Sequence, residues 1–187
     1  MVALTALWLP ILVSAVVVFL ISSVIHMATP MHKGDQTAIP NEDALLDALR
    51  AAGVQRGHFR FPYAGSMADM ASDEMKAKFR RGPVGVLTLT EGGEPTMGKE
   101  LLAWFLYSVV ISTVAGYVAG ISLAPGAGFE PVLRITSAIA LLTYCTSTVH
   151  ESIWKGVPWA VALRFAIDGV LYAVATGVVF GWLWPGV

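Results

Sequence analysis

Apolar residues gather in four long runs that polar segments separate. The runs extend over about Leu7 to Met27, Leu101 to Leu123, Pro131 to Trp154 and Ala160 to Trp184. A helix needs roughly 20 apolar residues to cross a bilayer. We therefore expect an all-α integral membrane protein with four transmembrane helices. The first run has no basic segment before it and no small-residue cleavage site after it, so we interpret it as a helix and not as a signal peptide.

Residues 28–99 separate the first run from the other three, and their pattern predicts a small α+β insert. The run IPNEDALLDALRAAGV predicts an amphipathic helix with Asn41 as its N-cap. GHFRFPY and VGVLTLT alternate in polarity as strands do. The expected domains are residues 1–27, the insert 28–99, and residues 100–187 with the last three helices.

A second helix is expected between the two strands of the insert. The run SMADMASDEMKAKFRR predicts it, with Ser66 as the cap and Met67, Met70 and Phe79 as core residues. The expected order is helix, strand, helix, strand. An insert of this size is marginal as an independent domain. We therefore expect it to pack against the membrane helices or against a partner.

Composition supports a membrane protein and excludes several other classes. Hydrophobic residues make up 56% and charged residues 13%, whereas soluble domains contain about 25% charged residues. The formal net charge is −1, which does not suggest a nucleic-acid partner. The single cysteine, Cys145, excludes an internal disulfide and a CxxC redox pair.

The distribution of basic residues predicts the orientation. Nine of the twelve Lys and Arg lie in residues 28–99, and the connection between the second and third helices has none. Cytoplasmic loops carry the Lys and Arg excess. We expect a cytoplasmic insert, with both termini on the outer side. Arg134 then falls on the outer side, against the trend.

Small residues recur every four positions in two of the helices. The two stripes are Ser108, Ser112, Gly116, Gly120 and Gly169, Ala173, Gly177, Gly181. Residues four apart share a helix face, and small residues let helix backbones approach closely in lipid. Each stripe is therefore a candidate helix–helix contact, within the chain, between copies or with another subunit.

A polar layer is expected near the inner ends of the helices. The second half of the third helix, TYCTSTVHESIW, is too polar to face lipid and should face the interior or water. The expected topology brings the following residues to similar depth: His26, His150, Glu151, Arg164 and Asp168. Arg164 and Asp168 lie four apart and can pair, and Glu151 is a second expected partner of Arg164. A structural ion pair is favoured over a proton or substrate route.

Two metal or haem hypotheses arise from the same region, although no cofactor is favoured. His26 and His150 on different helices are a weak candidate pair for haem. The stretch HMATPMH places Met27, Met31 and His32 beside His26, and thioether with imidazole groups suits copper. Histidines at helix ends are more often structural, so neither signal is specific.

Three stretches of the chain resemble a family of small, uncharacterised bacterial inner-membrane proteins. They are HFRFPYAGSMADM, RRGPVGVLTL followed by MGKELLAWFLYSVV, and IDGVLYAVATGVVFGWLWP. The resemblance runs from about His26 to the end of the chain. It implies a multi-pass protein of the bacterial inner membrane with four helices. It implies no activity, cofactor or site residue.

The function favoured by the sequence is a non-catalytic accessory or assembly subunit of a larger membrane complex, of the respiratory or photosynthetic electron-transfer type. No phosphate loop, GxSxG, HExxH or CxxC motif suggests an enzyme. Its expected partners are the lipid bilayer and either other membrane subunits or a second copy. One alternative is a small oligomeric transporter or channel that uses Glu151, Arg164 and Asp168. Another is a haem- or copper-binding membrane protein.

Overall fold

The computed structural model describes residues 1–186 and divides them into two compact units. The first unit comprises Met1–Asp35 and the chain from Thr96 onward, and the second comprises Gln36–Pro95. The first unit holds a short 3₁₀ helix, η1 (Leu4–Leu7), and four long helices: α1 (Trp8–Ala28), α5 (Gly98–Ser122), α6 (Phe129–Lys155) and α7 (Trp159–Trp182). All four are long and apolar enough to cross a membrane. The prediction of four such helices is confirmed.

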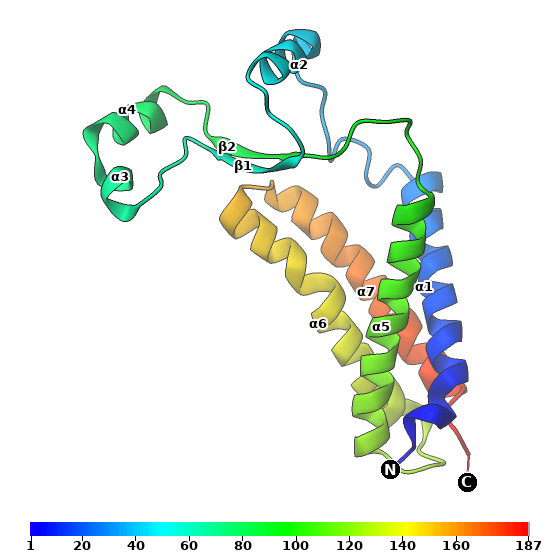
Figure 1. Ribbon diagram of the computed structural model, residues 1–187. Helices are drawn as coiled ribbons and strands as arrows, with labels where there is room; N and C mark the ends of the chain where they lie inside the picture. The colour runs from blue at the N-terminus through cyan, green and yellow to red at the C-terminus, as the bar shows by residue number, and fades with distance from the viewer. Residues whose placement is uncertain (187) are drawn as a thin grey trace. The chain divides into compact units, whose positions relative to one another are not determined.

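The four long helices run side by side as a bundle (Figure 1). The N-terminal segment and the segment that follows α7 lie at the same end of the bundle (Figure 1). Hydrogen bonds between distant segments hold that end together. The amide of Val2 donates to the carbonyl of Gly120 at 2.8 Å, and the amide of Gly126 donates to the carbonyl of Pro185 at 2.8 Å. The indole of Trp184 donates to the carbonyl of Ala124 at 3.0 Å.

The small-residue stripe of α5 faces the N-terminal segment and α7. The hydroxyls of Ser14 and Ser112 are hydrogen bonded at 2.9 Å between α1 and α5. A Cβ atom added to Gly116 would lie 3.0 Å from the ring of Phe180. This stripe therefore lies at a helix contact within the chain.

The stripe of α7 faces α6. A Cβ atom added to Gly177 would lie 2.9 Å from Cβ of Ser137 and 3.0 Å from the carbonyl oxygen of Leu133. One added to Gly169 would lie 2.5 Å from Sγ of Cys145. These contacts leave no room for a side chain, so the glycines set how closely α6 and α7 approach.

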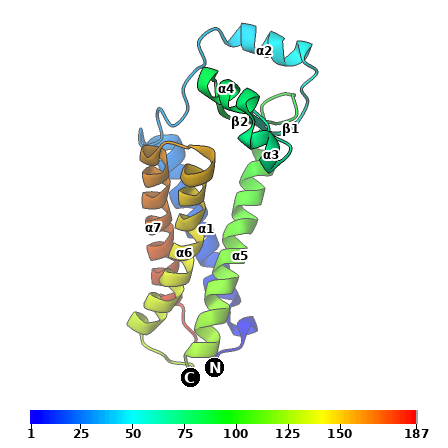
Figure 2. The ribbon, with the colours of Figure 1, turned by 90° about the vertical axis from the view of Figure 1, so that its left-hand side faces the viewer.

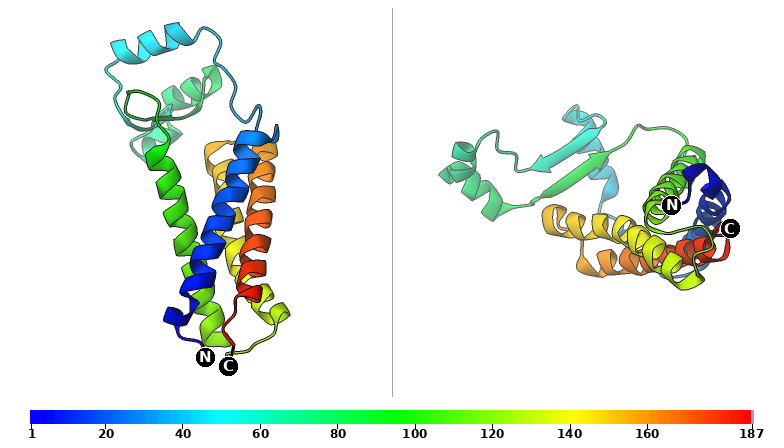
Figure 3. Two further views of the ribbon diagram at one scale, coloured as in Figure 1. Left: turned by 90° about the vertical axis from the view of Figure 1, so that its right-hand side faces the viewer. Right: turned by 90° about the horizontal axis from the view of Figure 1, so that it is seen from below.

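The second unit contains a two-stranded antiparallel sheet and three short helices. Its elements are α2 (Glu42–Ala51), β1 (Gly57–Phe61), α3 (Met67–Ala71), α4 (Asp73–Arg81) and β2 (Gly85–Leu89). Phe59 pairs with Leu87 at the centre of the sheet. The strands lie side by side, and α3 and α4 form the connection between them (Figure 3). The predicted order of a helix, a strand, a helical connection and a second strand is confirmed.

Two details of the insert were predicted wrongly. The expected single helix between the strands is two, because Ser72 adopts an extended ψ of 150° and its hydroxyl accepts from the amide of Met75 to cap α4. Met75 is the buried residue there, whereas Met67 is 85% exposed. Asn41 is the N-cap of α2, as predicted, but it has a left-handed conformation, with φ 56°, and its side chain makes no cap hydrogen bond. Ser66 does cap α3, by accepting from the amide of Asp69.

Candidate functional site

The chain turns sharply where it leaves α1. Thr29 ends the helix in an extended conformation, because a residue that precedes proline is disfavoured in helical geometry. The Thr29 hydroxyl donates to the carbonyl of Ile25 at 2.7 Å, which satisfies one carbonyl at the helix end. The amide of Asp35 then donates to the carbonyl of His32 at 3.2 Å. Gly34, with φ +93°, permits this turn.

Helix α7 supplies two charged residues to the same place. Arg164 and Asp168 lie one turn apart and share a helix face. Asp168 is 1% exposed, although a carboxylate is rarely buried without partners. Its surroundings must therefore compensate its charge.

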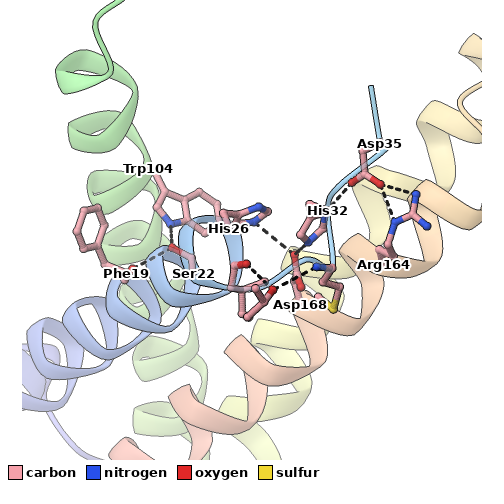
Figure 4. A network of polar contacts seen from close by, with 11 residues as sticks. Phe19, Ser22, His26, His32, Asp35, Trp104, Arg164 and Asp168 are labelled. Carbon is pink, nitrogen blue, oxygen red and sulfur yellow. Dashed lines mark hydrogen bonds and ion pairs between the residues drawn. The ribbon is translucent and has the colours of Figure 1, made fainter. Parts of the chain in front are cut away.

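Two histidines approach one oxygen of Asp168. Nε2 of His32 lies 2.9 Å from Oδ2 of Asp168, and Nε2 of His26 lies 3.4 Å from the same oxygen. The two imidazole rings stack, with centroids 4.2 Å apart. Figure 4 shows both rings converging on Asp168 from the end of α1 and from the turn that follows it. We call His26, His32 and Asp168 the His–His–Asp cluster.

A second carboxylate lies behind His32. Nδ1 of His32 lies 2.6 Å from Oδ2 of Asp35. The other oxygen of Asp35 accepts from Nε of Arg164 at 2.6 Å, and a second guanidinium nitrogen also contacts that oxygen (Figure 4). Burial alone would raise the pKa of Asp35, but the hydrogen bonds from His32 and Arg164 outweigh it and hold the pKa of this carboxyl below its ordinary value. Asp35 is therefore an anion that accepts from His32.

These contacts limit the state of the His32 ring. If Nδ1 alone carries a proton, it donates to Asp35 and Nε2 presents its lone pair to the carboxylate of Asp168, whereas a second proton on Nε2 would donate to Asp168. Two acceptors 2.9 Å apart repel each other unless a cation or a proton lies between them. The contact therefore requires either a second proton on the His32 ring or a cation bound at the cluster.

The geometry of the cluster suits a metal ion. One ligand atom from each of its three residues lies within 4.8 Å of the others. Two imidazoles and one carboxylate are a common donor set for divalent transition metals. A ligating histidine usually donates its other ring N–H to a carboxylate, which fixes the tautomer. Asp35 has this position behind His32, and Arg164 holds Asp35 in turn.

A half-open cavity between the four long helices adjoins the cluster. Its volume is about 400 Å³, and its wall includes His26 and Asp168 but not His32. The polar half of α6 contributes Tyr144, Ser147 and Thr148 to this wall. The expectation that part of this helix faces an internal space therefore holds for this face.

The predicted pairing within the polar layer is wrong. Arg164 pairs with Asp35, and Asp168 pairs with the two histidines. Glu151 instead pairs with Lys155 on its own helix, at 2.8 Å. The reason is that the turn after α1 reaches α7 and places Asp35 nearer to Arg164.

Several candidate residues lie apart from the cluster. His150 is on the exposed face of α6 and is not among the cluster residues. The side chain of Met31 packs against the apolar core, and Met27 is 80% exposed. The sequence analysis missed Asp35 altogether. The signal was the stretch TPMHKGD, in which a proline and a glycine bracket His32 and precede an acid.

No protein-family model, curated protein or solved structure matches the chain. The candidate site therefore depends on its own geometry.

Proposed function

We propose that the chain is a multi-pass membrane protein that binds a divalent transition-metal ion through His26, His32 and Asp168. The convergence of three ligand atoms within 4.8 Å, with Asp35 and Arg164 behind one of them, carries this proposal. An imidazole used only for packing does not need a carboxylate at each ring nitrogen.

Charge balance supports a cation at the cluster. Asp35 and Asp168 contribute two negative charges, and Arg164 contributes one positive charge. With neutral histidines the group carries a net charge of −1, which attracts a cation. A divalent ion changes the net charge to +1 and replaces the repulsion between His32 and Asp168 with two coordinate bonds.

The donor set indicates the class of metal. Imidazole nitrogen with carboxylate oxygen suits zinc, cobalt, iron or manganese in the divalent state. Copper(I) prefers thioether and thiolate sulfur, whereas the three residues of the cluster offer nitrogen and oxygen. The proposal therefore replaces the copper and haem hypotheses with a nitrogen- and oxygen-ligated divalent ion.

The proposal also covers the membrane in which the site lies, the orientation of the chain and the kind of complex to which it belongs. The Lys and Arg excess in residues 28–99 favours a cytoplasmic insert. The bacterial inner membrane is what the family resemblance implies. The cluster then lies near the cytoplasmic ends of the helices. The absence of a recognised enzyme motif in the sequence favours an accessory subunit of a larger membrane complex, in which the metal fixes the helix ends. The transporter alternative is weaker, because Glu151 is not part of the charged group.

A titration with Co²⁺ tests the proposal. The full chain, purified in mild detergent and treated with chelator, is titrated while its visible absorption is recorded. Imidazole and carboxylate ligation of Co²⁺ produces d–d bands that saturate at one ion per chain, and Zn²⁺ displaces them. A spectrum no different from that of Co²⁺ in buffer contradicts the proposal.

A further inference from the structure

The three residues of the His–His–Asp cluster come from three segments of the chain. His26 lies in the last turn of α1, His32 lies in the turn that follows it (residues 29–35), and Asp168 lies in α7. One ion can bind all three residues only while this turn lies against α7. Because a ligand favours the conformation that it binds, a metal ion at the cluster stabilises the docked position of the turn.

The same turn leads directly into the insert. The first compact unit includes the chain up to Asp35, and the second unit begins at Gln36. Figure 2 shows the chain leaving the end of α1 beside the start of α7 before it continues to α2. A contact that fixes the turn therefore fixes the point from which the insert starts.

The other contacts of the turn are weaker than coordinate bonds. Asp35 pairs with Arg164, whose side chain is 29% exposed, and an ion pair that water reaches contributes little to stability. The ring of His32 packs on that of Phe165, with centroids 4.8 Å apart, and Met31 packs against the apolar core. The turn is therefore held less firmly when no ion is bound.

The cluster suits an ion that exchanges with its surroundings. Structural metal sites are usually closed by four protein ligands, whereas the cluster offers three. The side chain of His26 is 39% exposed and lies in the wall of the half-open cavity. An ion therefore has a path to the cluster, and its occupancy follows the concentration of the metal outside the chain.

Freedom at this attachment matters to the insert because little of the insert is buried. Met75 is the one buried residue between Gln36 and Pro95, a range that the structure describes in full. Phe59 and Phe61, which share one face of the sheet, are exposed. A unit with so small a core depends on contacts outside itself. Which contacts it reaches depends on how freely its start moves.

From these observations we infer that the metal ion regulates the insert. A bound ion holds the turn after α1 against α7 and so fixes the start of the insert at Gln36. Without the ion, the turn leaves α7 for part of the time, and the start of the insert moves more freely. The inference rests on the proposed function, because it requires a metal at the cluster.

Cleavage of the turn by a lysine-specific protease tests the inference. Lys33 is exposed in the turn, next to His32, and proteolysis requires the chain around the cleaved bond to open locally. The full chain in lipid nanodiscs is digested with chelator or with saturating Zn²⁺, after a Co²⁺ titration of the same preparation has measured metal binding. We expect Zn²⁺ to slow cleavage after Lys33 at least about tenfold.

Three other lysines are controls within the same digest. Lys76 and Lys78 lie in α4, and Lys155 is the last residue of α6. None of them belongs to the turn or to the cluster, so Zn²⁺ should not change their cleavage. Equal slowing after Lys33 and Lys155 would show a general stabilisation of the bundle and would overturn the inference.

A spin label at the first residue of the insert measures its motion directly. Gln36→Cys is labelled with a nitroxide in a Cys145→Ser background, since Cys145 is the one cysteine of the chain. Zn²⁺ should broaden the spectrum of the label, and adding His32→Ala should remove this effect. His150→Ala is the matched control and should keep the effect, because His150 is not part of the cluster.

The Co²⁺ titration separates failure of the inference from failure of the proposed function. If Co²⁺ binds but Zn²⁺ leaves the cleavage after Lys33 or the label at position 36 unchanged, the inference is overturned and the proposed function stands. If Co²⁺ does not bind, the proposed function is contradicted and the inference fails with it.

Discussion

The imidazole of His32 lies 2.9 Å from the carboxylate of Asp168, although 136 positions separate the two residues in the chain. The contact joins the turn after α1 to the middle of α7. Asp35 and Arg164 form a second polar contact between the turn and α7, next to that of His32 and Asp168. The polar groups at this end of the bundle therefore form a connected chain and not a set of separate pairs.

Removing one ligand should weaken metal binding strongly. We expect His32→Ala or Asp168→Asn to lower the affinity for Co²⁺ more than about 100-fold, because each removes one of three protein ligands. The change is measured by titration with visible absorption. His150→Ala is the matched control, since this histidine lies outside the cluster, and it should bind as the unaltered chain does. Equal losses in all three proteins would point to a general defect in folding.

Weakening the support behind His32 should have a smaller effect. Asp35→Asn keeps the shape of the side chain but removes the anion that orients His32 and pairs with Arg164. We expect the metal affinity to fall about 10- to 100-fold, as for other carboxylates that support a ligating histidine. Competition with a chromophoric chelator measures it. An unchanged affinity would mean that Asp35 pairs with Arg164 but does not support His32 as a metal ligand.

Acid should destabilise the metal-free bundle through Asp35. Its pKa is lower in the folded chain than the ordinary value of 3.8. A group with a lowered folded pKa stabilises the fold above its unfolded pKa, and this contribution is lost as pH falls through the folded pKa. Thermal unfolding followed by circular dichroism from pH 6 downward should therefore show a steeper loss below about pH 4 in the unaltered chain than in Asp35→Asn. Parallel curves would contradict this assignment.

A larger side chain at Gly177 should separate α6 from α7. A Cβ atom there would already lie 2.9 Å from Ser137, and overpacking of this kind costs about 1–3 kcal/mol. We expect Gly177→Val to lower the midpoint of thermal unfolding. Val174→Leu is the control, because Val174 is 52% exposed on the same helix. If both variants unfold alike, the α6–α7 contact tolerates a side chain at this position.

The helices and their contacts were predictable because local patterns determine them. The four apolar runs match α1, α5, α6 and α7 to within a few residues. The stripe that contains Gly177 lies at a helix contact, as four-residue spacing of small residues indicates. Length, hydropathy and spacing are properties of a single segment, so one sequence is sufficient to recognise them.

The cluster was not predictable in the same way. Its partners lie on α7 and in an irregular turn, and the turn is folded back by Thr29, Pro30 and Gly34. Sequence spacing suggested that Arg164 would pair with Asp168 on its own helix. The structure instead gives each of them a partner from the turn, because a buried charge gains more from a partner that also excludes water. Which charged residues pair therefore depends on the tertiary arrangement, and sequence spacing alone does not determine it.

The most direct test of the central proposal is X-ray absorption spectroscopy of the Zn²⁺-loaded full chain. Ligation by His26, His32 and Asp168 predicts a first shell of nitrogen and oxygen at about 2.0–2.1 Å, with no sulfur and with the outer-shell signature of two imidazoles. The imidazole signature should fall by half in His26→Ala. A shell of oxygen alone, or one that includes sulfur, would contradict the site and the function proposed from it.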